Sequence, residues 1–176
     1  MSSSRDIHLA VYLATARNPA MNTNEITGTL SSVLEDVTVT PPGPPHTYFG
    51  VAQRLLPAIR ILAEPSVSAW AMALLSAHTL ECLLKAYLSR DGSDDRLKHQ
   101  QTRHNLDGLW RQAASEGLAV PADPPDWVVR LSELHNAPYY LRYSTGINGI
   151  VTPQPALMAS ELVALLHVVD ATLLQA

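Results

Sequence analysis

Apolar residues recur along residues 48–174 with the spacing of helices that bury one face. Between Tyr48 and Glu64 they return at intervals of four, four and three residues, and Pro65 ends the segment. Pro57 lies inside this segment and is expected to kink or split the helix. The predicted stripe consists of Val51, Leu55, Ile59 and Leu62.

The clearest predicted helix starts at Ser66 or Ser68, either of which can cap it, and runs to about Arg90. Gly92 lies just beyond its end, where glycine favours termination. A helix of about twenty residues spans about 30 Å, the height of a small domain. Its apolar stripe consists of Trp70, Leu74, Ala77, Leu80, Leu84 and Leu88.

Three further helices are predicted after a polar stretch at residues 91–103. Asn105 can cap the first, Asp123 with two prolines starts the second, and Pro155 starts the last. They end near Glu116, near Pro138 and near Leu174. Residues 144–153 form a loop, and the turn signal at 148–149 leaves a short hairpin as an alternative. The last helix places Leu162, Leu165, Leu166, Val169 and Leu173 on one side.

Four or five helices joined by loops of moderate length predict an all-α fold, namely an up-and-down antiparallel helical bundle over residues 48–176. Residues 1–47 have a broken apolar pattern and end in Pro41-Pro42-Gly43-Pro44-Pro45. Prolines fix the backbone and remove hydrogen-bond donors, so we expect an extended, Pro-rich N-terminal arm there. The sequence has no glycine-rich phosphate loop and no paired Cys-x-x-Cys motif, and we expect no cofactor.

Charged residues make up only 16% of the 176 residues, against about 25% in a typical soluble domain. Either uncharged polar residues cover the surface, or apolar surface is buried against a partner. The Leu- and Ala-rich helices at 66–90 and 155–174 are less polar than a helix with one fully exposed side. They are therefore central in the bundle or form the seam of a homodimer. No uninterrupted apolar run of about 18 residues occurs, so no membrane span is expected.

The net charge of −4 argues against a protein that coats nucleic acid broadly, but it leaves room for a local basic site. Ten of the twelve basic residues are arginine, which suits phosphate contacts, although a GC-rich genome favours arginine too. Cys82 is the single cysteine and cannot form an internal disulfide. This fits a reducing cytoplasm.

Residues 77–143 resemble the HEPN family, the nucleotide-binding domain of higher eukaryotes and prokaryotes. The resemblance is carried by residues 77–88 (AHTLECLLKAYL), by His104-Asn105-Leu106, by Leu109 with residues 113–117, and by Arg142-Tyr143. It covers roughly residues 48–174 and implies a helical bundle that forms a homodimer. Many family members are metal-independent ribonucleases in toxin–antitoxin or phage-defence systems. Others pair with nucleotidyltransferases or serve as binding modules.

Arg130 and His135 resemble the Arg-x4-6-His motif of the ribonucleases in this family. There the histidine acts as general base or acid and the arginine stabilises charge on phosphorus. This sequence departs from the motif, because apolar Leu131 follows the arginine. Five residues of regular helix also place the two side chains about 140° apart. They converge only across a helix break or a dimer axis.

Six residues are candidate nucleic-acid contacts. Phosphate contact by a basic loop and stacking of bases on tyrosine are the functional interpretations. A solvated loop and tyrosines packed at the end of the bundle are the alternatives. The six are Arg103, His104, Tyr139, Tyr140, Arg142 and Tyr143.

Glu81 and Lys85 are spaced for a helical ion pair, and we expect a structural polar pair that bonds to the loop at His104 and Asn105. His78 and Cys82 share the same spacing and could hold a metal, but no second ligand pair follows, so no metal site is predicted.

Three functional hypotheses follow from the sequence. The first is a HEPN-like protein associated with RNA or a nucleotide, with metal-independent ribonuclease activity. The second is a non-catalytic module, a pseudo-enzyme, that binds a partner protein such as a nucleotidyltransferase. The third is a small metalloprotein that uses His78 and Cys82.

Overall fold

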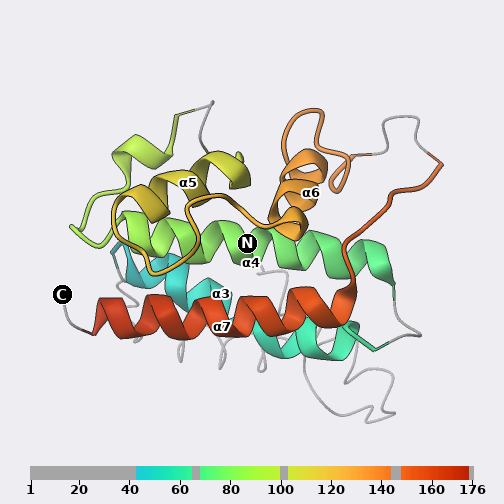
Figure 1. Ribbon diagram of the computed structural model, residues 1–176, viewed down its shortest axis with the longest axis horizontal. Coiled ribbons are helices and arrows are strands. Elements are labelled where there is room, and N and C mark those ends of the chain that lie inside the picture. The colour runs from blue at the N-terminus through green and yellow to red at the C-terminus, as the bar shows by residue number, and fades with distance from the viewer. Residues whose placement is uncertain (1–42, 65–67, 100–102, 144–147, 175–176) are drawn as a thin grey trace, which may run out of the picture. The chain divides into compact units, whose positions relative to one another are not determined.

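The computed structural model describes residues 43–64, 68–99, 103–143 and 148–174, all within the compact unit Pro42–Ala176 (Figure 1). Across them it contains five α-helices, one short 3-10 helix and no strand, so the predicted all-α fold is confirmed. Most of the predicted arm, residues 1–42, lies outside the described residues. The elements are α3 (His46–Leu62), α4 (Ala69–Leu88), η1 (Asp95–Leu97), α5 (Leu106–Ser115), α6 (Asp126–His135) and α7 (Pro155–Leu173).

The helix ends follow the local chemistry of the sequence. The side chain of Ser68 accepts a hydrogen bond from a first-turn N–H of α4 at 3.3 Å. The side chain of Asn105 does the same for α5 at 3.1 Å. Beyond the ends of these two helices, Gly92 and Gly117 have φ angles of 90° and 98°, a region that favours glycine.

The first helix differs from its prediction in two ways. It continues through Pro57, whose side chain is exposed, so the expected split does not occur. Its buried face is also rotated relative to the predicted stripe, and only Ile59 belongs to both. The stripe was misplaced because apolar residues cover more than one side of this helix. The buried residues are Phe49, Ala52, Leu56 and Ile59.

Helix α4 is the centre of the bundle. It contacts α3, α5, α6 and α7, and 14 of its 20 residues are buried. The sequence predicted a single stripe, but the surrounding helices bury nearly every side from Ser76 to Leu88. The exposed exception within the predicted stripe is Trp70, whose indole N–H donates to the backbone oxygen of Leu141 at 3.2 Å. The low polarity of α4 therefore follows from its central position.

The helices do not alternate strictly up and down. In Figure 1, α3 runs opposite to α4, whereas α4 and α7 run in the same direction. The chain between them, which carries α5 and α6, returns to the end where α4 begins. The expected antiparallel alternation therefore holds for α3 and α4 but not for α4 and α7.

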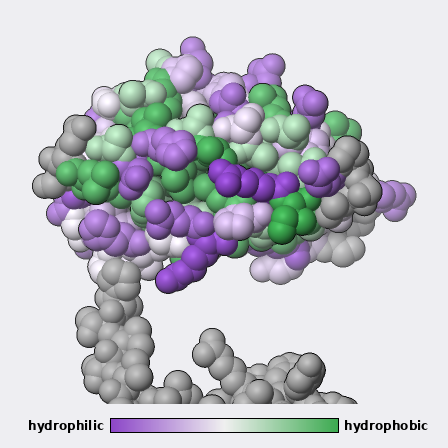
Figure 2. Space-filling model, turned by 90° about the horizontal axis from the view of Figure 1, so that it is seen from below, coloured by the Kyte–Doolittle hydropathy of each residue, from purple (hydrophilic) through white to green (hydrophobic). Residues whose placement is uncertain are grey.

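Helix α7 is apolar yet only partly covered. Its mean hydropathy reaches 1.6 over 18 residues, of which 22% are buried. Among the described residues it is the one helix long and apolar enough to cross a membrane, a test that core helices also pass. Figure 2 shows apolar patches between hydrophilic ones on the lower side of Figure 1, where α3 and α7 lie. The buried side of α7 consists of Met158, Ala159, Leu162, Leu165 and Val169.

The loop before α7 has no strand in its described part, residues 148–154. The rest of the alternative hairpin, residues 144–147, lies outside the described residues.

Candidate functional site

Four titratable side chains meet inside the bundle around the carboxylate of Glu81. Lys85 Nζ donates to Glu81 Oε1 at 2.7 Å, so the ion pair expected from the helical spacing is present. His135 Nε2 lies 2.7 Å from Glu81 Oε2, and His104 Nδ1 lies 3.1 Å from the same oxygen. Glu81, Lys85 and His135 are buried and His104 is half-buried. We call these four residues the Glu81 cluster.

Three helices position the Glu81 cluster. Glu81 and Lys85 lie one turn apart in the middle of α4. His104 directly precedes Asn105, the N-cap of α5, and His135 is the last residue of α6. The hydroxyl of Ser132 accepts a hydrogen bond from a backbone N–H at the start of α5 at 3.1 Å, which holds α5 and α6 together. Both imidazoles are thereby brought to the same carboxylate oxygen.

Glu81 stays ionised although it is buried. Burial would raise its pKa, but hydrogen bonds from His135 and Lys85 outweigh this effect and lower the pKa to about 2. The ammonium of Lys85 balances the negative charge at 2.7 Å. A buried charge is stable only when it is paired and hydrogen-bonded, and Glu81 meets both conditions.

The shared oxygen determines where the imidazole protons are. Glu81 Oε2 can only accept, so each imidazole carries a proton on the nitrogen that faces it. The other nitrogen of His104, Nε2, bonds to no described residue. The other nitrogen of His135, Nδ1, is buried and has no hydrogen-bond partner among the described residues.

His104 connects the buried carboxylate to an aromatic surface. Its ring packs edge-on against Tyr139, with centroids 5.9 Å apart, and Tyr139 packs edge-on against Tyr143 at 6.2 Å. Tyr143 is 61% exposed and Arg142 is exposed. We call His104, Tyr139, Arg142 and Tyr143 the His104 face. It joins four of the six predicted nucleic-acid contacts.

The backbone of Tyr139 is strained. Its φ angle is 66°, in the left-handed region, which costs an ordinary residue about 1–2 kcal/mol. Two hydrogen bonds to its carbonyl oxygen, from the backbone N–H groups of Arg142 and Tyr143 at 2.9 and 3.1 Å, hold this turn. Strain of this kind gathers at functional sites, which supports a role for the His104 face.

The environment of His104 favours the neutral imidazole. Burial lowers its pKa below the usual 6.5, and the nearby charge of Arg142 lowers it further. The hydrogen bond that His104 donates to Glu81, and the negative charge of Glu81, oppose this shift but do not cancel it. His104 therefore presents an unprotonated nitrogen near neutral pH.

The candidate metal pair His78 and Cys82 is close but poorly suited to a metal. Cys82 Sγ lies 3.9 Å from His78 Nε2. Burial raises the pKa of Cys82 to about 12, and among the described residues the pair has no third side chain with which to form a metal-binding group. The structure thus gives no support to the metalloprotein hypothesis based on this pair.

The predicted catalytic pair is not brought together. Arg130 is exposed and bonds to Glu133 Oε2 at 2.7 Å, in a groove of about 410 Å³ between α6 and the start of α7. His135 is fully buried and bonds to Glu81. Helix α6 continues without a break through both residues, so the two side chains leave it in different directions, as five residues of regular helix require.

The other two predicted nucleic-acid contacts are not among the residues of the His104 face. Tyr140 lines a small pocket of about 210 Å³ together with Arg130 and Ile150. Arg103 is exposed and directly precedes His104 in the chain.

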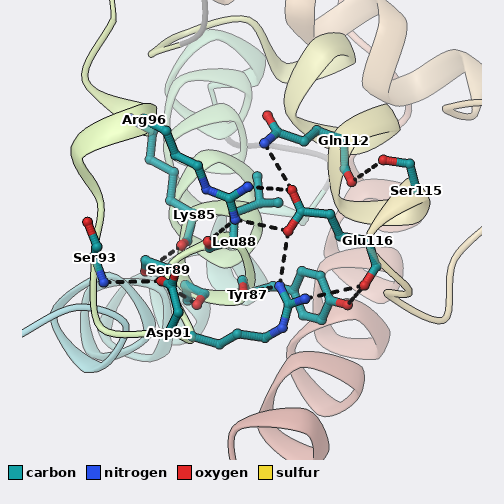
Figure 3. Close-up of polar contacts among 12 residues, drawn as sticks. Lys85, Tyr87, Leu88, Ser89, Asp91, Ser93, Arg96, Gln112, Ser115 and Glu116 are labelled. Carbon is teal, nitrogen blue, oxygen red and sulfur yellow. Dashed lines mark hydrogen bonds and ion pairs between the residues drawn. The ribbon is translucent and has the colours of Figure 1, made fainter.

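A second polar cluster was not predicted from the sequence. Glu116, just after α5, accepts hydrogen bonds from Arg96 at 2.6 and 2.9 Å, from Gln112 at 3.1 Å and from Arg90 at 3.3 Å (Figure 3). We call these four residues the Glu116 cluster. Arg96 also donates to the backbone oxygen of Leu88 at 2.6 Å. A polar loop alone suggests solvation, and only the fold brings this arginine to the end of α4.

No family model, curated protein or solved structure matches the chain. The resemblance to the HEPN family therefore rests on the residues of the sequence alone.

Proposed function

We propose that this protein is a HEPN-like RNA-binding protein that cleaves single-stranded RNA without a metal ion, with His104 as the residue that transfers the proton. The observation that carries the proposal is the Glu81–His104 pair at the edge of the His104 face. A carboxylate that holds one imidazole nitrogen as N–H leaves the other free to accept a proton. Lys85 and His135 hold the carboxylate in place from the buried side.

The groups that act on the RNA all belong to the His104 face, while Glu81 holds the imidazole of His104 from behind. His104 Nε2 takes the proton from a ribose 2′-hydroxyl, and the oxygen attacks the adjacent phosphorus. The P–O bond to the 5′ oxygen breaks, which yields a 2′,3′-cyclic phosphate and a 5′-hydroxyl that takes its proton from solvent. Arg142 supplies positive charge for the phosphate, and Tyr139 and Tyr143 offer rings on which unpaired bases stack.

The test uses the full chain in EDTA with an end-labelled single-stranded RNA. We expect cleavage by the wild type and none of an oligonucleotide that lacks 2′-hydroxyls. His104→Ala should abolish cleavage but keep binding of the uncleavable oligonucleotide, as measured by fluorescence anisotropy. His167→Ala, on an exposed position of α7, is the control for loss of a histidine and should cleave normally.

Arg130→Ala distinguishes the two candidate sites. If His104 transfers the proton, this variant cleaves at the wild-type rate. If instead Arg130→Ala loses cleavage and His104→Ala cleaves normally, the activity is assigned to the pair Arg130 and His135. RNA that stays intact at high protein concentration would overturn the ribonuclease proposal.

A second candidate function is a non-catalytic module that binds a second copy of the chain or a partner protein through α7. The observation that favours it is the apolar helix α7, of which only 22% is buried within the most apolar window. Leu157 and Ala164 lie exposed along it, and Leu174 is exposed just after its end. Contiguous apolar surface that a protein leaves exposed is commonly covered by a partner.

The mass in solution tests this second candidate. A homodimer predicts twice the mass of 19.1 kDa. Ala164→Glu should then give the monomer mass, because it places a charge in the contact, whereas Ser115→Glu, on an exposed position of α5, should not. A monomer at all concentrations would exclude the homodimer.

A further inference from the structure

Three side chains of the Glu81 cluster form a set of metal ligands that no short sequence motif contains. Glu81 Oε2, His104 Nδ1 and His135 Nε2 all lie within 4.8 Å of one another. They come from the middle of α4, from the residue before the cap of α5 and from the end of α6. Their separations in the chain are 23 and 54 residues from Glu81.

The chemistry of this set points to a particular class of metal. Two imidazole nitrogens and one carboxylate oxygen, with a fourth position left open, are typical of zinc sites. Magnesium and calcium prefer sets of oxygens, and copper(I) prefers thiolates or thioethers. The set therefore suits Zn²⁺ and its spectroscopic substitute Co²⁺.

The two pairs that share Glu81 Oε2 require little movement to accept such an ion. Tetrahedral ligands about 2.0–2.1 Å from zinc lie about 3.3 Å from one another. The present distances from Glu81 Oε2 are 2.7 Å to His135 Nε2 and 3.1 Å to His104 Nδ1. Relative to about 3.3 Å, these two pairs need to separate by about 0.6 and 0.2 Å, and the two imidazole nitrogens, which lie within 4.8 Å of each other, need to reach the same separation. Lys85 holds the second oxygen of the same carboxylate at 2.7 Å, which fixes its orientation.

We propose that Glu81, His104 and His135 bind one Zn²⁺ ion, which replaces the two hydrogen bonds that converge on Glu81 Oε2. Each imidazole then uses the nitrogen that faces the carboxylate as a ligand, and its proton moves to the other nitrogen. No proton is released. The ammonium of Lys85 close to the ion, and the lack of a partner for His135 Nδ1 among the described residues, make the site weaker than a structural zinc site.

Zinc binding would also switch off the reaction proposed above, a consequence that rests on the proposed function. With Zn²⁺ on Nδ1 of His104, the proton of this imidazole is on Nε2. That nitrogen can no longer accept the proton of a 2′-hydroxyl. We therefore expect Zn²⁺ to inhibit RNA cleavage in the wild type.

Cobalt titration of the metal-free full chain tests the site. We expect one equivalent of Co²⁺ to produce the absorption bands of tetrahedral cobalt, and Zn²⁺ to displace it. His104→Ala removes a ligand and should weaken Co²⁺ binding by more than about 100-fold, beyond the 10–100-fold typical when only a supporting residue is lost. His104 is half-buried, so this variant is the least disruptive of the three ligand removals.

His78→Ala is the matched control, because this exposed histidine lies one turn from Glu81 on α4. It should keep the cobalt spectrum and the affinity. The absence of tetrahedral bands, or equal binding by His104→Ala and the wild type, would overturn the site. Loss of binding in His78→Ala alone would assign the metal to a surface histidine and overturn it as well. Since the spectrum needs no RNA, the metal site and the ribonuclease proposal fail or succeed separately.

Discussion

The Glu81 cluster and the Glu116 cluster each keep a glutamate that is shielded from solvent in its ionised form, but they do so with different partners. In both, hydrogen bonds and nearby cations hold the pKa of a glutamate at about 2, against a usual value of 4.5. Glu81 is 7% exposed at its side chain and is bonded by two histidines and a lysine. Glu116 is 24% exposed and is bonded mainly by two arginines.

The different partners give the clusters different roles: the Glu81 cluster can take part in chemistry, whereas the Glu116 cluster only stabilises the fold. Imidazoles change protonation near neutral pH and can bind metals, whereas arginine stays charged and does neither. The Glu116 cluster joins the C-terminal ends of α4 and α5 (Figure 3). Arg90 also packs over the ring of Tyr87, 4.2 Å from its centroid. We therefore expect the Glu116 cluster to act on stability alone and the Glu81 cluster to act on stability and function.

The largest difference between the clusters should appear when each glutamate is removed. Glu81→Ala leaves the ammonium of Lys85 buried without its partner, and we expect it to lower the free energy of unfolding by about 3–5 kcal/mol. Glu116→Ala frees arginines that reach solvent, and we expect a loss of about 1 kcal/mol. Urea unfolding followed by circular dichroism measures both.

Glu161→Ala is the control for the change in net charge, because Glu161 is exposed on α7. It should unfold like the wild type. Equal losses in Glu81→Ala and Glu116→Ala would show that burial does not distinguish the clusters.

The next prediction concerns the pair Glu81 and Lys85. Replacing both by apolar residues of similar size, Glu81→Leu with Lys85→Met, removes the charge and its partner together. We expect the double variant to be about 1–2 kcal/mol more stable than Glu81→Ala. It should not reach the wild type, because His135 then loses the acceptor of its hydrogen bond. A double variant less stable than Glu81→Ala would contradict this account.

Lowering the pH from 7 to 5 should change the stability that the Glu81 cluster contributes but not the stability that the Glu116 cluster contributes. The pKa of His104 is below 6.5 in the folded chain, so the unfolded chain binds a proton that the folded chain does not. This contribution to stability is complete above pH 6.5 and decreases as the pH falls toward the folded pKa. Arginine does not titrate, so the Glu116 cluster contributes nothing in this range.

Urea midpoints at pH 7, 6 and 5 test this difference. Glu116→Ala should follow the wild type at a constant offset, whereas His104→Ala should show a shallower decrease. Some decrease should remain in His104→Ala, because desolvation also lowers the pKa of His78, although much of its side chain is exposed. Below about pH 4.5, both glutamates lose their contribution as the pH falls toward about 2. Identical slopes in all three proteins above pH 5 would count against a role for His104.

The sequence predicts local features of this molecule well, but it predicts poorly which residues far apart in the chain contact one another. The caps at Ser68 and Asn105, the glycines after α4 and α5, and the all-α fold follow from spacing and propensity. The meeting of His104 and His135 at Glu81 depends on how α5 and α6 pack on α4, which no local period encodes. The buried face of α3 was predicted wrongly for a related reason. Several sides of this helix are apolar, and its packing against other helices determines which side is buried.

The smallest expected effect belongs to Gln112 in the Glu116 cluster. Gln112→Ala removes one hydrogen bond of 3.1 Å to Glu116 Oε1, while Arg96 continues to bond both carboxylate oxygens at 2.6 and 2.9 Å. The acceptor is an ionised carboxylate that Arg96 still satisfies at a partly exposed position, so we expect a loss of only about 0.5 kcal/mol and a slight shift of the urea midpoint. Asn105→Ala is the counterpart beside the Glu81 cluster. It removes the cap of α5, and we expect a loss of about 1 kcal/mol. Because Asn105 directly follows His104, this variant should also weaken the cobalt spectrum, whereas Gln112→Ala should leave it unchanged. A larger loss of stability in Gln112→Ala than in Asn105→Ala would mean that the Glu116 cluster, with its exposed arginines, contributes more to the free energy of unfolding than its exposure suggests.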